Sequence, residues 1–214
     1  EKNADELVVL DIDASVKNKE PNYELIKKLA NECRMPLCYG GGVKTTSHFE
    51  KIIELGVEKI AISSAANENP KLIEDASRIV GNQSVVVIID LKKRAFRDKY
   101  DIYIHNAQKK INVGIFDFIR ELENLGAGEI VINSIDNDGK MNGYNIELIK
   151  KIKGIVNIPI TAMGGAGSMN HIKDLIDSIG TVGCAAGSLF VFKGKYRAVL
   201  INYPSIEEKD KITI

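Results

Sequence analysis

The sequence predicts an α/β fold of the (βα)8 TIM-barrel class. Short, wholly apolar runs alternate with longer amphipathic stretches, which is the pattern of βαβ units. Similar motifs recur in both halves of the chain, and 214 residues with 44% hydrophobic content suffice for one barrel with a sizeable core. We therefore expect one barrel domain over residues 1–214, built from two half-barrel repeats.

Seven β-branched runs account for the expected strands. Most of them are apolar throughout rather than alternating, which suits strands that a parallel sheet buries on both faces. They occupy residues 7–12, 36–40, 59–63, 84–90, 129–134, 158–163 and 181–186.

Helices are expected between these strands. Residues 23–31, 48–55 and 115–125 each place apolar side chains on one helical face. Residues 92–113 differ, because they are polar with a single alternating piece, DIYIH. This segment predicts a long loop or a small hairpin on the rim of the barrel, where long ordered loops are often functional.

Composition excludes several classes of function. Lys plus Arg and Asp plus Glu both number 29, and a net charge of zero argues against a nucleic-acid or membrane-surface binder. No apolar run reaches the roughly 18 residues of a membrane helix, and the opening EKNADE predicts no signal peptide. The three cysteines and three histidines lack metal-ligand spacing, so we expect reduced thiols, a cytoplasmic location and no metal or other cofactor.

Three pairs of segments repeat at a nearly constant offset of 124 or 125 residues. PLCYGGGVK resembles IPITAMGGAGS, KIAISSAA resembles VGCAAGSLF, and LVVLDIDAS resembles IVINSIDNDG. Each half thus carries a glycine-rich turn after one strand and a small-residue turn after the next. Main-chain N–H groups of such turns form anion sites, so two copies predict a ligand with a phosphate at each end. The alternative, that the glycines only permit tight turns, remains open.

The repeat also reveals a gap at the start of the chain. The strand at 84–90 precedes the repeated strand at 129–134, and its counterpart in the first half would lie before residue 1. Seven strands plus this missing one make the count of eight. We therefore expect the barrel to lack its first βα unit in this chain.

The motifs together resemble the cyclase subunit of imidazole glycerol phosphate synthase, an enzyme of histidine biosynthesis. The matching pieces cover nearly the whole chain and include DELVVLDIDAS, YGGGVKT, SVVVIID, SIDNDG, GYNIELI, GGAGSM and AAGSLF. The resemblance implies a barrel that takes ammonia from a glutaminase partner and reacts it with a doubly phosphorylated ribotide.

The resemblance also implies roles for individual residues. Asp90 matches a catalytic acid at a strand end, while the second family acid belongs to the absent first strand; Asp138 is expected to hold a substrate hydroxyl or to act in proton transfer. One phosphate site is expected at Gly42, Ser63 and Ser64, and the other at Gly139, Gly165, Gly187 and Ser188. The charged layer that gates ammonia entry is expected at Glu6, Lys59 and Glu129.

Two departures from the histidine enzyme keep alternatives open. The tail SLFVFKGKYRAVLINYP resembles a paralogous branch associated with amidination of bacterial surface sugars, again with a glutaminase, and Lys140 follows Asp138-Gly139 where the family has Thr. A phosphoribosyl isomerase would share the barrel and both phosphate sites but would need no charged layer. A non-catalytic subunit that activates a glutaminase is a further reading.

Overall fold

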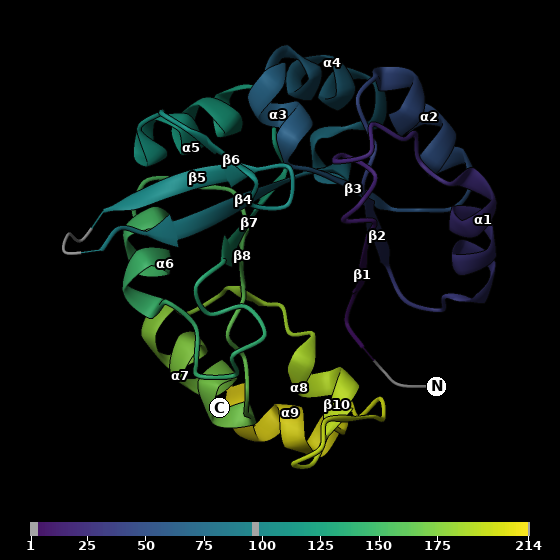
Figure 1. Cartoon of the computed structure of the whole chain (residues 1–214). Helices are drawn as coiled ribbons and strands as arrows, with labels where there is room; N and C mark the ends of the chain where they lie inside the picture. Colours follow the sequence, from purple (N-terminus) through teal and green to yellow (C-terminus); the bar gives the residue numbers. More distant parts are fainter. Residues whose placement is uncertain (1–3, 96–98, 214) are drawn as a thin grey trace.

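The computed structural model describes residues 4–95 and 99–213, in which a curved, mostly parallel sheet carries helices on its outer face (Figure 1). Seven parallel strands follow one another in the order β1-β2-β3-β4-β7-β8-β9. This architecture confirms the TIM-barrel class. The seven strands are β1 (Leu7–Leu10), β2 (Leu37–Gly40), β3 (Lys59–Ile62), β4 (Val85–Lys93), β7 (Glu129–Ser134), β8 (Ile160–Met163) and β9 (Gly183–Cys184).

The central strand β4 shows why these runs are apolar throughout. Val85, Val87 and Ile89 belong to the large core between sheet and helices, whereas Val86 and Ile88 belong to a smaller cluster inside the barrel. Successive side chains of a strand point to opposite faces, so a strand buried on both faces needs apolar residues at every position.

Helices follow most strands, and polar caps begin several of them. Asn22, Thr45, Asn145 and Ser168 each accept a hydrogen bond from the third residue after them, which satisfies a free N–H of the first helical turn. The helices are α1 (Tyr23–Glu32), α2 (Thr46–Glu54), α3 (Ser64–Glu68), α4 (Lys71–Val80), the 3-10 helix η1 (Asn82–Ser84), α5 (Ile115–Asn124), α6 (Ile146–Lys153), α7 (Met169–Ile179), α8 (Ser188–Val191) and α9 (Ile206–Thr213).

The polar segment after β4 is a hairpin rather than an irregular loop. β5 (Tyr100–Ile104) pairs antiparallel with the end of β4, and β6 (Lys109–Ile111) pairs antiparallel with β5. The alternating piece DIYIH supplies β5, whose Ile102 and Ile104 are buried. A second small ribbon near the C-terminus pairs β10 (Phe192–Lys193) with β11 (Ala198–Val199).

The two edges of the parallel sheet are β1 and β9. Within the described residues, each pairs with a single parallel neighbour, β2 or β8 respectively. Figure 1 shows the C-terminal segment with α8 and α9 beside the space between them. Asp5, just before β1, contacts this segment through the Tyr203 hydroxyl at 3.2 Å and the Lys209 ammonium at 2.9 Å. No helix in the described ranges is long and apolar enough to cross a membrane.

Candidate active site

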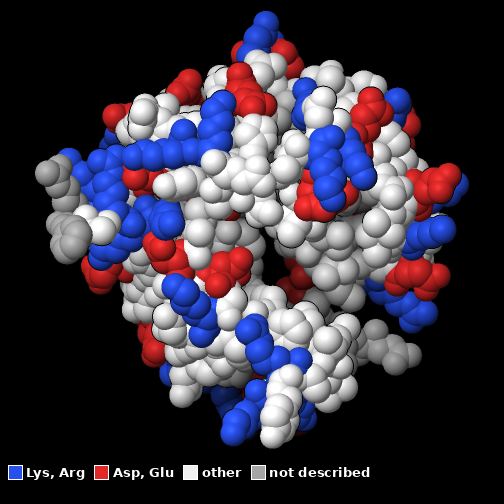
Figure 2. Space-filling model, in the orientation of Figure 1, with Lys and Arg blue, Asp and Glu red and all other residues white. Residues whose placement is uncertain are grey.

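A cavity of about 290 Å³ lies where the parallel strands end. Figure 2 shows a hollow at the centre of the molecule, with acidic side chains at its edge. Residues at or near the carboxyl ends of six neighbouring strands, β1, β2, β3, β4, β7 and β8, meet there because the carboxyl ends of parallel strands share one face. Five of the residues expected at the site line this cavity: Gly42, Ser63, Ser64, Asp90 and Asp138.

Asp90 lines this cavity and is largely enclosed by the barrel. Its carboxylate accepts a hydrogen bond of 2.7 Å from the Asn133 side-chain amide. Burial raises the pKa of Asp90; the Asn133 hydrogen bond lowers it, and the nearby Asp138 charge raises it again. A carboxylic acid whose pKa is raised holds a proton more readily, which suits a group that accepts and returns a proton.

The two serines after β3 have different tasks. Ser64 Oγ accepts the main-chain N–H of His105 at 2.9 Å, which ties the β5–β6 hairpin to the first candidate anion site. Ser63 Oγ is buried and finds no partner among the described residues. A buried hydroxyl without a partner is costly, so Ser63 is the hydroxyl available to a ligand.

Two glycines of the repeated turns, Gly42 and Gly165, serve the packing of the chain itself. A Cβ on Gly42 would lie 2.6 Å from the Lys19 carbonyl oxygen, and a Cβ on Gly165 would lie 2.1 Å from that of Gly143. At both positions, main-chain carbonyl groups occupy the space that a Cβ would need. The tight-packing interpretation accounts for these two glycines.

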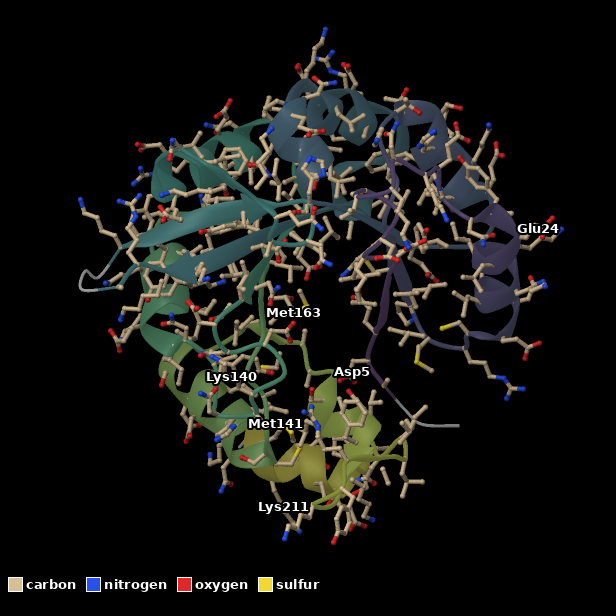
Figure 3. All side chains as sticks on the ribbon, in the orientation of Figure 1. Asp5, Glu24, Lys140, Met141, Met163 and Lys211 are labelled. Carbon is tan, nitrogen blue, oxygen red and sulfur yellow. The ribbon has the colours of Figure 1, made fainter. Side chains whose placement is uncertain are left out.

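The second candidate anion site lies on the other half of the rim. Gly139 and Gly187 face open space, because a Cβ on either would meet no atom within 4 Å. Arg197 joins the two sides, since its Nη2 lies 3.5 Å from the Gly139 carbonyl and 3.4 Å from Ser188 Oγ. Figure 3 places Lys140 and Met141 in the adjoining loop between β7 and α6.

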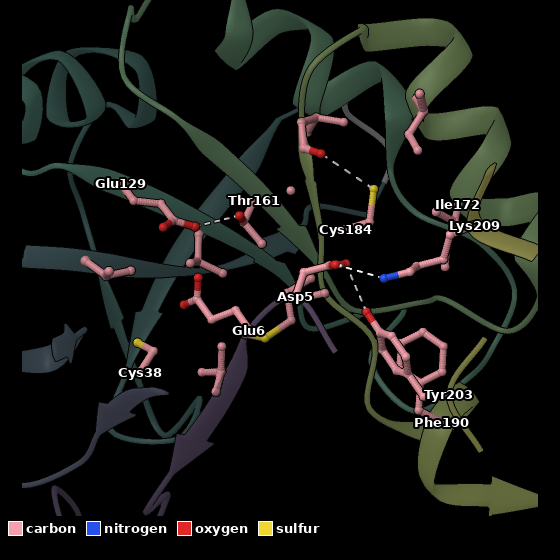
Figure 4. Close-up of a pocket in the computed structure, with 18 of the residues that line it drawn as sticks. Asp5, Glu6, Cys38, Glu129, Thr161, Ile172, Cys184, Phe190, Tyr203 and Lys209 are labelled. Atoms are coloured by element: carbon pink, nitrogen blue, oxygen red, sulfur yellow. Dashed lines mark hydrogen bonds and ion pairs between the residues drawn. The ribbon is translucent and has the colours of Figure 1, made fainter. Parts of the chain in front are cut away.

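The opposite end of the barrel carries an ionic cluster. Lys59, the first residue of β3, places its Nζ 2.6 Å from Glu6 Oε2 and 2.8 Å from Glu129 Oε2. Burial opposes the charged ammonium, but the hydrogen bonds to Glu129 and Glu6 outweigh it and raise the pKa of Lys59. Thr161 donates to the other oxygen of Glu129 at 2.6 Å and fixes its carboxylate (Figure 4). The structure thus brings together the three residues expected to form a charged layer.

A second cavity, of about 420 Å³, extends from this cluster into the barrel (Figure 4). It shares Ala61, Ile88 and Met163 with the cavity around Asp90, so a thin apolar layer separates the two. Cys38 and Cys184 also line it, and burial raises the pKa of both thiols, that of Cys184 to about 11. Neutral thiols are poor nucleophiles and poor metal ligands. No group of three or more potential metal ligands occurs in the described parts of the chain.

Sequence reasoning missed Asn133, Thr161 and Arg197. Asn133 stands directly opposite Asp90 in the parallel register of β4 and β7. Its signal in the sequence was a polar residue near the end of an otherwise apolar run, EIVINS. Thr161 carried no local signal, because its partner Glu129 lies 32 residues away. The contact of Arg197 with the Gly139 carbonyl spans 58 residues and could not be read from the local sequence either.

The curved parallel sheet, with an acid and hydroxyls at its strand ends, defines a TIM-barrel protein with a site where such barrels carry catalysis. A family model described as "Histidine biosynthesis protein" matches residues 1–197, so the chain belongs to the HisF group of this family, as its relatives confirm.

Three relatives illustrate the range of similarity. A "Putative imidazole glycerol phosphate synthase subunit HisF" of Leptospira borgpetersenii is 58% identical over 212 residues, which cover 99% of this chain and 84% of the relative. A "Putative imidazole glycerol phosphate synthase subunit hisF3" of Vibrio vulnificus (strain YJ016) is 54% identical, covering 99% and 81%. An "Imidazole glycerol phosphate synthase subunit HisF" of Clostridium botulinum (strain Okra / Type B1) is 38% identical, covering 89% and 75%.

Proposed function

We propose that the chain is an ammonia-dependent cyclase subunit that receives ammonia from a glutaminase and adds it to a bis-phosphorylated ribotide of histidine biosynthesis. The observation that supports this most directly is the arrangement along the barrel axis. The Lys59 cluster lies at the amino ends of the strands, Asp90 lies at their carboxyl ends, and two adjoining cavities with a thin apolar layer between them lie along the path from one to the other.

The ionic cluster suits the entry of a small neutral molecule. Lys59 pairs with one oxygen of Glu6 and one of Glu129, so both carboxylates at the mouth share a single counter-charge. The apolar wall of Ala61, Ile88 and Met163 then excludes water and ions more strongly than neutral ammonia. The glutaminase partner would dock over this end. An isomerase would need no such layer, so the cluster favours the ammonia-dependent function.

At the other end, Asp90 would act as acid and base. Ring closure needs a group that takes a proton from the attacking nitrogen and returns one to the leaving oxygen. Asn133 holds the carboxylate in place, and burial keeps its pKa raised. Asp138, lining the same cavity, would hold a substrate hydroxyl. The phosphates would bind at Gly42, Ser63 and Ser64 on one side and at Gly139, Gly165, Gly187 and Ser188 on the other.

The test is turnover by the full-length protein. With ammonium chloride and the histidine-pathway ribotide we expect formation of imidazole glycerol phosphate and aminoimidazole carboxamide ribotide, in a cytoplasmic reaction without metal or cofactor. Asp90→Asn should abolish it. If Asp90→Asn instead leaves the reaction of the complex with glutaminase intact, the chain is a non-catalytic activating subunit. Absence of ribotide turnover at every ammonium concentration would refute the cyclase proposal.

A second candidate is ammonia delivery for amidination of a surface-polysaccharide sugar. It rests on the resemblance of the tail at residues 188–204 to the paralogous branch and on Lys140, which follows Asp138-Gly139 where the histidine enzyme has Thr. Ammonia-dependent amidination of a nucleotide-linked sugar without ribotide turnover would establish this function instead.

A further inference from the structure

The β10–β11 ribbon directs one guanidinium toward the second candidate anion site. The Arg197 main-chain N–H donates to the Gly194 carbonyl at 3.0 Å and closes the tight turn between the two strands. The guanidinium carbon lies 4.8 Å from the centre of the Phe192 ring, within the range of a cation–π contact. The turn and the ring together hold the side chain in one direction.

The guanidinium of Arg197 is held in position, but several of its N–H donors have no strong hydrogen-bond partner. Nη2 touches Ser188 Oγ at 3.4 Å and the Gly139 carbonyl at 3.5 Å, both longer than the usual 2.9 Å or so of a strong hydrogen bond. Nε and Nη1 have no partner among the described residues, and no described carboxylate forms an ion pair with Arg197. A fork with free donors is suited to a ligand with several acceptor oxygens.

The charges around Arg197 also favour an anion. Residues 178–206 contain Lys193, Lys195 and Arg197 and no Asp or Glu, in a chain whose net charge is zero. Figure 2 shows Lys and Arg side chains over this C-terminal part, below the central hollow. The acid next to this site in the sequence is Asp138, which precedes Gly139, but Asp138 lines the cavity of Asp90.

Helix α8 alone cannot supply this attraction. It has four residues, so few peptide dipoles are aligned at its start. Open space at Gly139 and Gly187 leaves room for a ligand. An anion bound there would need a positive charge from a side chain, because the short helix does not supply one.

We infer that Arg197, together with Ser188 Oγ, binds a phosphoryl group of the substrate at the second anion site. This inference rests on the proposed function, whose second phosphate it assigns to a side chain. The phosphate monoester of a ribotide and the diphosphate of a nucleotide-linked sugar present the same chemistry. The guanidinium fork fits two phosphate oxygens at once, which a lysine ammonium does not.

The test is a titration of the full-length protein with inorganic phosphate, followed by ³¹P NMR. We expect Arg197→Gln to weaken one phosphate site about tenfold, as for the loss of one charge-assisted hydrogen bond, and Arg197→Lys to give an intermediate loss. Lys195→Gln, an exposed change in the same ribbon, should stay within about twofold of wild type because solvent and salt screen it. Thermal melts of each variant show that it is folded.

Three results would overturn the inference. They are no phosphate binding by the wild type, equal affinity of wild type and Arg197→Gln, or equal losses in Arg197→Gln and Lys195→Gln. Kinetics then identify the source of the phosphoryl group: Arg197→Gln should raise KM with little change in kcat for whichever of the ribotide and the nucleotide-linked sugar is turned over. If Arg197→Gln weakens phosphate binding but the wild-type protein turns over neither the ribotide nor the nucleotide-linked sugar, the proposed function is refuted and the inference is supported.

Discussion

At the scale of single residues, Asp90 combines burial with reactivity. The carboxylate is enclosed by the barrel and held by one strong hydrogen bond from Asn133. Burial favours the protonated form, so the side chain opposes folding once it is charged. Strain of this kind is common at functional sites, where activity and stability conflict.

Replacement of Asp90 should reveal this conflict. Because the pKa of Asp90 is raised in the folded protein, protonation of Asp90 favours the folded state. This contribution to stability is fully present below the pKa of Asp90 in the unfolded chain, about 3.9, and is lost as pH rises through its pKa in the folded protein. Asp90→Asn lacks this loss, so the variant should gain Tm relative to wild type between pH 4.5 and pH 7.5. Thermal melts at both pH values measure the gain. The proposed cyclase activity of Asp90→Asn should fall at least about 100-fold.

The matched control is Asp117→Asn, a change of an exposed acid on α5. Its Tm relative to wild type should change much less with pH. A difference between Asp90→Asn and wild type that is the same at both pH values would contradict the argument.

At the scale of elements, the glycines of the repeated turns differ in their role: one allows close packing of the chain, and the other leaves space open for a ligand. Gly165 follows β8 in the left-handed region, at φ of 113°, and its missing Cβ makes room for the Gly143 carbonyl. Gly187 precedes α8 with φ of −103° and with open space around it. Only the first of these glycines is required by the fold.

Alanine substitutions should distinguish the two turns. Gly165→Ala should reduce the free energy of unfolding by about 2–4 kcal/mol, because it adds both a carbonyl clash and backbone strain. Gly187→Ala should change it by less than about 0.5 kcal/mol, since the new methyl group meets no atom. Urea denaturation of both variants measures the difference. Equal stabilities would show that the Gly143 carbonyl moves away at little cost.

At the scale of the whole molecule, the barrel separates two kinds of chemistry along one axis. The ionic cluster joins residues that start or precede three strands, and the acid lies where strands end. Between them the interior cluster of Cys38, Ala61, Val86, Ile88 and Val131 is apolar. A ligand that passes from one end to the other must therefore be small and uncharged.

Replacement of Lys59 should affect glutamine-dependent and ammonium-dependent turnover differently. Lys59→Met leaves Glu6 and Glu129 facing each other without a counter-charge, so the free energy of unfolding should fall by about 1–3 kcal/mol. On the proposed function, glutamine-dependent turnover with the proposed glutaminase should fall more than ammonium-dependent turnover, because external ammonium can reach the site from the substrate side. Steady-state rates with each nitrogen source measure the ratio.

Lys27→Met, a change of an exposed lysine on α1, is the control for Lys59→Met. It should leave both the ratio and the stability close to those of wild type. A Lys59→Met variant with an unchanged ratio would show that the cluster is structural and does not govern ammonia entry.

The order of the elements, the repeat and the positions of the turns were determined by the sequence alone. Alternation of apolar runs and amphipathic stretches is a local property, and it predicted the strands and the three helices we named to within a few residues. Strand ends were less predictable: the run at 181–186 yields only Gly183–Cys184, and β4 extends to Lys93 because β5 pairs with it.

Contacts between distant residues were decided by the tertiary structure. The Lys59 cluster spans 53 and 70 residues, and Arg197 reaches Gly139 across 58. The Asp90–Asn133 hydrogen bond depends on the register of two parallel strands joined by a hairpin and a helix. Composition and periodicity report which face a residue occupies, whereas register and sheet curvature decide which faces meet, and these arise only when the whole chain packs.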